Sequence, residues 1–96
     1  MGKQQIVKEE NRRYINHTSD CIITDPKWDR RIRIAKKNSK VTVVWNPYTE
    51  TTKAIADISD TGYQDFICVE AVNAYSDLPT VKPGETCCVS TVISCE

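Results

Sequence analysis

Apolar residues recur with a period of two along most of the chain, and this spacing limits the fold more than any other feature. The clearest example is residues 41–45, Val-Thr-Val-Val-Trp, which end at Asn46-Pro47. Proline biases the residue before it toward an extended conformation, so we expect a loop to begin there. Successive strand residues point to opposite faces, so the pattern predicts strands. We therefore predict an all-β fold, either a sandwich or a piece of one.

Five further strands are predicted, at residues 6–14, 21–24, 31–34, 66–71 and 86–94. Turn-forming residues separate them. Asp25-Pro26 ends the second strand, and the polar residues 36–40 are predicted to join 31–34 to 41–45 as a hairpin. Residues 82–85, Lys-Pro-Gly-Glu, form a turn into the last strand. Residues 50–58 have the spacing of one or two helical turns.

Length and charge exclude several classes of protein. The chain has 96 residues, enough for one domain with a thin core. Its 13 basic and 13 acidic residues balance, so no overall field attracts nucleic acid or an anionic membrane. Apolar stretches are too short for a signal peptide or a membrane span, and we expect a cytoplasmic protein.

Five cysteines without an export signal are expected to be free thiols. Cys87 and Cys88 are adjacent, so on a strand they point to opposite faces and cannot bind one metal together. His17 and Cys21 could share a helical face, but two further ligands are missing. No metal site is predicted.

Glu70 is the most informative single residue, because it is a carboxylate within the apolar run at residues 66–71. Alternation puts Glu70 on the same face as Phe66 and Cys68. Burying an ionised carboxylate among apolar residues costs free energy unless it is paired, solvated in a cleft or has a raised pKa. A general base that works near neutral pH needs such a raised pKa. The alternative is that Glu70 sits near a sheet end or forms an ion pair with an arginine such as Arg31 or Arg33, and composition alone favours that alternative.

Trp45, Asn46 and Tyr48 come at the end of the strongest strand, where binding loops usually lie. Aromatic rings stack on pyranoses, and an asparagine amide both donates to and accepts from hydroxyls. A buried aromatic anchor with Asn46 capping a turn is an equal alternative. The basic residues within 30–37 are predicted to form a solvated face in preference to a phosphate site. His17 is predicted to be a surface residue in preference to an acid or base.

Several motifs occur in a fixed order. They are residues 9–14 (Glu-Glu-Asn-Arg-Arg-Tyr, similar to E-x-D-R-x-Y), Asp25, residues 30–34, residues 43–48 (Val-Val-Trp-Asn-Pro-Tyr, similar to V-V-W-N-P-W), Ala56-Asp57, Tyr63, residues 66–70 (Phe-Ile-Cys-Val-Glu, similar to V-C-V-E) and residues 82–85. Together they resemble the C-terminal third of the glucose-6-phosphate 1-epimerases, also called hexose-6-phosphate mutarotases or apospory-associated protein C-like proteins. The resemblance runs from about residue 6 to the end of the chain.

The resemblance implies part of a galactose-mutarotase-like β super-sandwich whose enzymes interconvert the α and β anomers of hexose 6-phosphates such as glucose 6-phosphate. In these enzymes a carboxylate takes the proton of the anomeric hydroxyl while a histidine protonates the ring oxygen. By the motif match Glu70 is the general base, in place of either structural alternative, and Trp45 and Asn46 bind the substrate. No metal or organic cofactor is implied.

The chain also departs from this family. The acid histidine and the phosphate-binding arginines lie in upstream segments with no counterpart here, and His17 does not match the acid. Asn11 stands where the family has aspartate, and Tyr48 where it has a second tryptophan.

Residues 1–96 are therefore expected to be the C-terminal portion of a single, incomplete mutarotase-like domain that has no meaningful activity alone. Its uncovered sheet surface is expected to cause self-association. The alternative is a non-catalytic carbohydrate-binding or interaction module, and in either case the ligand is a hexose phosphate or another sugar. A third reading is a small free-standing β domain of unrelated function.

Overall fold

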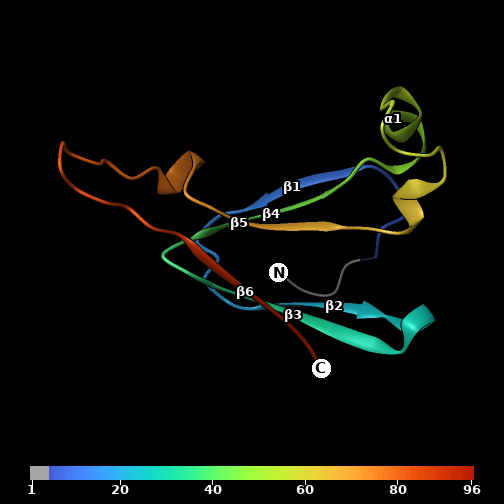
Figure 1. The fold of residues 1–96 in the computed structure, drawn as a ribbon, viewed down its shortest axis with the longest axis horizontal. Helices are drawn as coiled ribbons and strands as arrows, with labels where there is room; N and C mark the ends of the chain where they lie inside the picture. Colours follow the sequence, from blue (N-terminus) through green and yellow to red (C-terminus); the bar gives the residue numbers. More distant parts are fainter. Residues whose placement is uncertain (1–4) are drawn as a thin grey trace.

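Two three-stranded antiparallel sheets lie one above the other in the computed structural model, which describes residues 5–96 (Figure 1). Sheet A has the order β1 (Glu10–Tyr14), β4 (Val41–Asn46), β5 (Cys68–Val72). Sheet B has the order β2 (Cys21–Asp25), β3 (Arg30–Lys37), β6 (Ser90–Cys95). The prediction of an all-β sandwich is confirmed.

The remaining elements are short and lie at the ends of the sheets. They are α1 (Tyr48–Ala54) and the 3-10 turns η1 (Pro26–Trp28), η2 (Gly62–Gln64) and η3 (Tyr75–Asp77). The helical turns predicted within residues 50–58 thus begin two residues earlier than expected and stop at Ala54. Among residues 5–96, no helix has the length and hydropathy needed to span a lipid bilayer.

The predicted hairpin between residues 31–34 and 41–45 is wrong. β3 pairs with β2 and β6, whereas β4 pairs with β1 and β5, so residues 38–40 carry the chain from sheet B to sheet A. The Ser39 hydroxyl at this crossing donates to the carbonyl oxygen of Val72, 2.7 Å away. The physical reason is burial: β4 is the most apolar strand, and a central position between β1 and β5 pairs its backbone on both edges and shields its side chains with neighbours on both sides.

The true hairpin joins β2 to β3 through η1, with Asp29 in the left-handed conformation (φ 48°). The turn predicted at residues 82–85 is present, since the Glu85 amide donates to the Lys82 carbonyl at 3.0 Å. Gly84 has a φ of 83°, as the second central residue of a Pro-Gly turn requires. The strand after it starts only at Ser90, and β1 starts only at Glu10.

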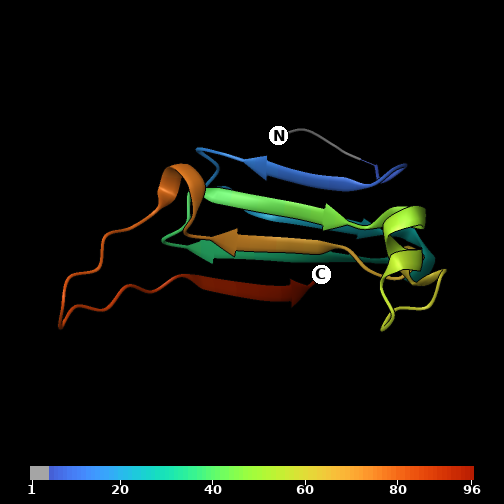
Figure 2. The ribbon, with the colours of Figure 1, turned by 90° about the horizontal axis from the view of Figure 1, so that it is seen from above.

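The hydrophobic core is thin and is centred on β4. Its buried apolar members are Cys21, Ile34, Val41, Val43 and Val44. Sheet A is displaced sideways over sheet B, so that β6 lies beyond β5 rather than beneath it (Figure 2). Every residue of β6 is exposed as a result. The segment between η3 and β6 extends away from both sheets (Figures 1 and 2).

Candidate functional site

The face of sheet A turned away from sheet B, here called the outer face, brings Glu70 and Trp45 together. In the strand register Glu70 of β5 lies opposite Val43 of β4, and Trp45 lies opposite Cys68. Since paired strand residues share a face, all four side chains point outward. A hollow of about 350 Å³ lies on this face. It is lined by Asn11, Val43, Trp45, Glu70, Val72, Ala74 and Tyr75.

Glu70 is exposed on this face and is therefore solvated. No residue of the described range 5–96 forms an ion pair with it. The pairing with Arg31 or Arg33, one form of the alternative that composition favoured, is absent because those arginines lie on β3 in the other sheet.

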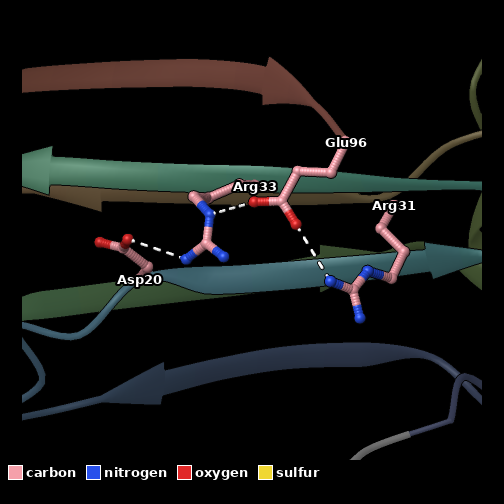
Figure 3. A network of polar contacts seen from close by, with 4 residues as sticks. All are labelled: Asp20, Arg31, Arg33 and Glu96. Atoms are coloured by element: carbon pink, nitrogen blue, oxygen red, sulfur yellow. Dashed lines mark hydrogen bonds and ion pairs between the residues drawn. The ribbon is translucent and has the colours of Figure 1, made fainter.

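Arg31 and Arg33 belong to a polar network on sheet B (Figure 3). Both bind Glu96, Arg31 at 3.1 Å, and Arg33 also binds Asp20 at 3.1 Å. Hydrogen bonds from Arg33 and Arg31 hold the pKa of Glu96 below its ordinary value of 4.5. Arg30 is likewise paired with Asp25, so each of the three arginines of β3 has a carboxylate partner, which accords with a solvated charged face.

Asn46 lies on the opposite face of sheet A from its neighbour Trp45. It is 2% exposed, and its amide nitrogen donates to the carbonyl oxygens of Tyr63 (3.0 Å) and Phe66 (2.7 Å). Its amide oxygen accepts the backbone N–H of Tyr48 at 2.8 Å. Asn46 therefore fastens the start of α1 and the segment before β5 to the end of β4. The structure separates this residue from the Glu70 and Trp45 side chains.

Three residues that the sequence did not single out for this site lie on or beside the outer face. Asn11 pairs with Trp45, and Arg13 pairs with Val43, so β1 adds polar groups beside the hollow. The Arg13 guanidinium lies 4.5 Å from the ring centre of Tyr75, within the range of a cation–π contact. Alternation along β1 would have grouped Asn11 with Arg13, but only the pairing with β4 places them near Glu70.

His17 lies on the other side of sheet A. Its Nδ1 is 2.8 Å from the Thr42 hydroxyl, and Lys36 Nζ donates to the same oxygen. Burial, and second the charge of Lys36, lower the pKa of His17. Thr42 and Val43 are adjacent on β4 and point to opposite faces, so the sheet separates His17 from Glu70. The histidine is half-buried and not fully on the surface as predicted.

A larger cavity of about 1280 Å³ lies between the two sheets. Val44, Asn46 and Val69 line it from sheet A, and Cys21, Ile23 and Ile32 from sheet B, among others. We assign this space to the sandwich interior, because neither Glu70 nor Trp45 lines it. Within residues 5–96 no three His, Cys, Asp or Glu side chains cluster in a way that could hold a metal ion. The five cysteines are free thiols.

A family sequence model and individual curated proteins place the chain in the same family. The sequence model of the aldose 1-epimerase family matches residues 2–94. A protein of Cenchrus ciliaris named "Putative glucose-6-phosphate 1-epimerase" is 31% identical over 77 residues, which are 80% of this chain and 23% of that protein. Proteins of the same name from Salmonella typhimurium and Escherichia coli are 32% and 30% identical over 73 residues, 76% of this chain and 25% of each relative.

The chain spans about a quarter of the length of these curated relatives. No solved structure matches it significantly. The family match nevertheless covers almost every residue, and it includes the strands that carry Glu70 and Trp45. The chain therefore belongs to the aldose 1-epimerase family.

Proposed function

We propose that this chain is the C-terminal part of an isomerase that interconverts the α and β anomers of hexose 6-phosphates, with glucose 6-phosphate as the substrate. The family match and the names of the relatives support the reaction class. The observation that carries the proposal is the position of Glu70, an exposed carboxylate in a hollow beside Trp45.

The reaction needs one base and one acid. Glu70 takes the proton of the anomeric hydroxyl, the bond between C1 and the ring oxygen breaks, and C1 becomes an aldehyde. An acid on the other side of the hemiacetal supplies a proton to the ring oxygen. Rotation about the C1–C2 bond and the reverse steps then give the other anomer. Trp45 presents an aromatic ring on which the apolar face of the pyranose can stack.

His17 is excluded as the acid of this site because the sheet lies between it and Glu70. A base without its acid forfeits a factor of about 10² to 10⁴ in rate. The chain alone is therefore expected to leave anomer exchange at the buffer rate. We assign Asn46 a positioning role, since its amide already bonds three backbone groups of the loop beside the site.

Binding can be tested separately from catalysis because the chain has only two tryptophans. Trp28 is 69% exposed and lies in the turn between β2 and β3 of sheet B, whereas Trp45 lies on sheet A. The Trp28→Phe variant keeps Trp45 as its single tryptophan, and its fluorescence is expected to change on titration with glucose 6-phosphate. In the matched Trp45→Phe variant the remaining Trp28 should not respond. A response in both variants, or in neither, would count against Trp45 as the stacking platform.

Catalysis is tested by replacing the C-terminal quarter of the Escherichia coli relative with this chain. Saturation-transfer NMR on glucose 6-phosphate then measures anomer exchange. The chimera is expected to catalyse exchange, and Glu70→Gln should lower its rate by about 10² to 10⁴. Glu85→Gln, at an exposed loop position, is the control and should leave the rate unchanged. A folded chimera that retains full activity with Glu70→Gln would remove Glu70 as the base.

A non-catalytic sugar-binding module is the second candidate, favoured because no histidine among residues 5–96 lines the hollow that holds Glu70. The same experiments separate the two functions. A fluorescence response in the Trp28→Phe variant, together with a folded but inactive chimera, would establish binding without catalysis.

A further inference from the structure

β6 is an unprotected sheet edge. Among residues 5–96, each outer strand of the sandwich has a free edge, and three of these strands carry charged residues that discourage pairing: β1, β2 (Asp25) and β5 (Glu70). β6 has the sequence Ser-Thr-Val-Ile-Ser-Cys, with no charge and no proline. Long, uncharged edges readily pair with another strand. β6 is therefore the edge of this molecule best suited to receive one.

The backbone groups that β6 presents can be identified from its pairing with β3. The Glu96 amide donates to the Arg31 carbonyl at 2.7 Å, so Glu96 faces β3. In an antiparallel ladder, alternate residues of a strand bond to the same neighbour. Thr91, Ile93 and Cys95 consequently point their N–H and C=O groups away from β3. This set is symmetric about Ile93.

The side chains of β6 are exposed to solvent, as are the backbone groups on its outer edge. Val92 is 63% exposed and Ile93 is 69% exposed, on opposite faces of the strand. Glu96 binds Arg31 and Arg33 at one end of β6, and Lys36 and Lys37 lie opposite Thr91 and Ser90 at the other end. A second strand would therefore meet apolar side chains around Ile93, at the centre of the edge.

The chain exposes more surface than a compact monomer of the same mass. Its accessible surface is 7162 Å², whereas a compact monomer of this mass exposes about 5600 Å². Its radius of gyration is 15.3 Å, against about 12.5 Å for a compact domain of this length. The surplus of about 1600 Å² is spread over the whole chain and includes the exposed strand β6, whereas each partner of a stable complex buries roughly 800 Å².

We propose that two copies of this chain pair through their β6 strands, antiparallel and about a two-fold axis at Ile93, so that the two B sheets become one continuous sheet. Ile93 then lies opposite the partner's Ile93, and Thr91 opposite the partner's Cys95. In this register all the outward backbone groups of residues 91, 93 and 95 find partners. A second copy fits because the set is self-complementary, as a two-fold interface demands. The inference concerns this chain by itself, so it is tested separately from the chimera experiment that tests the proposed function.

Sedimentation velocity over a range of concentrations tests the pairing. The wild-type chain is expected to show a monomer–dimer equilibrium. Ile93→Lys places like charges opposite each other across the axis and should raise the dissociation constant at least about tenfold. Ile93→Pro should do the same, since it removes an outward N–H but no bond to β3. Leu78→Lys, a control at a 74% exposed loop residue, should dimerise like the wild type.

Far-UV circular dichroism of each variant establishes that the sandwich remains folded. Amide hydrogen exchange locates the interface: Thr91, Ile93 and Cys95 should gain protection as the concentration rises, while the free edge of β1 should not. A wild-type chain that stays monomeric would overturn the proposal. A dimer unaffected by both Ile93 variants, or one that protects β1 or β5 instead, would also overturn it.

Discussion

Strands β4 and β6 have similar sequences but opposite surroundings. Val-Thr-Val-Val-Trp-Asn and Ser-Thr-Val-Ile-Ser-Cys are both six residues rich in β-branched side chains. β4 is buried along almost its whole length, whereas every residue of β6 is exposed. The polar residues at their ends differ in the same way: Asn46 is 2% exposed, and Glu96 is an exposed member of a surface network.

The difference shows that strand propensity and burial are separate properties. β4 has a neighbour on each side and sheet B beneath it, whereas β6 has β3 on one side and no strand of sheet A above it (Figures 1 and 2). Substitutions in or next to the two strands should therefore have unequal effects on stability. Three experiments test this expectation.

The largest effect is expected at Asn46. Asn46→Ala removes the bonds to Tyr63, Phe66 and Tyr48 and leaves their partly buried backbone groups without this partner. Urea unfolding followed by circular dichroism should show a loss of about 2 to 4 kcal/mol. Asn11→Ala, at an exposed residue of β1, should change stability by less than about 0.5 kcal/mol. Equal effects at both positions would mean that the buried amide does not hold the end of β4.

The next effect compares one valine in each strand. Val41 is fully buried, so Val41→Ala should destabilise the fold by about 2 kcal/mol through lost burial and a residual cavity. Val92 is 63% exposed, and Val92→Ala should stay within about 0.5 kcal/mol. Both are measured by urea unfolding at a protein concentration low enough to keep the chain monomeric. A large loss at Val92 under these conditions would show that β6 is covered in solution.

The smallest effect is expected at Glu96. Its pKa is lower in the folded chain than in the unfolded chain because Arg33 and Arg31 donate to it. Its stabilisation is therefore present above the unfolded pKa, near 4.5, and is lost as pH falls through the lower folded pKa. The melting temperature of Glu96→Gln should be slightly below that of the wild type at pH 7 and should match it in strong acid. High salt should reduce the difference at pH 7; a difference independent of pH would contradict this origin.

Much of the local structure was predictable from the sequence, because the signals are local. The residue pattern predicted a strand close to each of the six observed strands. Pro47 marked the end of β4, and Pro83-Gly84 form the predicted turn before β6. The hairpin into β4 was predicted wrongly. A polar turn between two strand patterns does not reveal whether the chain returns to the same sheet or crosses to the other.

The site was predictable only in part. Motif order pointed to Glu70 and Trp45, which share a face, while the neighbouring Asn46 turned to the other side. Asn11, Arg13 and Tyr75 reach the same region through strand pairing and a ring contact, which the sequence pattern does not specify.

By itself the sequence determined the β class, the turn positions and which residues within a strand share a face. Those properties follow from backbone sterics and alternation over a few residues. The tertiary structure decided which sheet each strand joined, that Glu70 stands apart from Arg31 and Arg33, and that β6 is left open. These outcomes depend on contacts between segments far apart in the chain, where burial and strand pairing outweigh local preference.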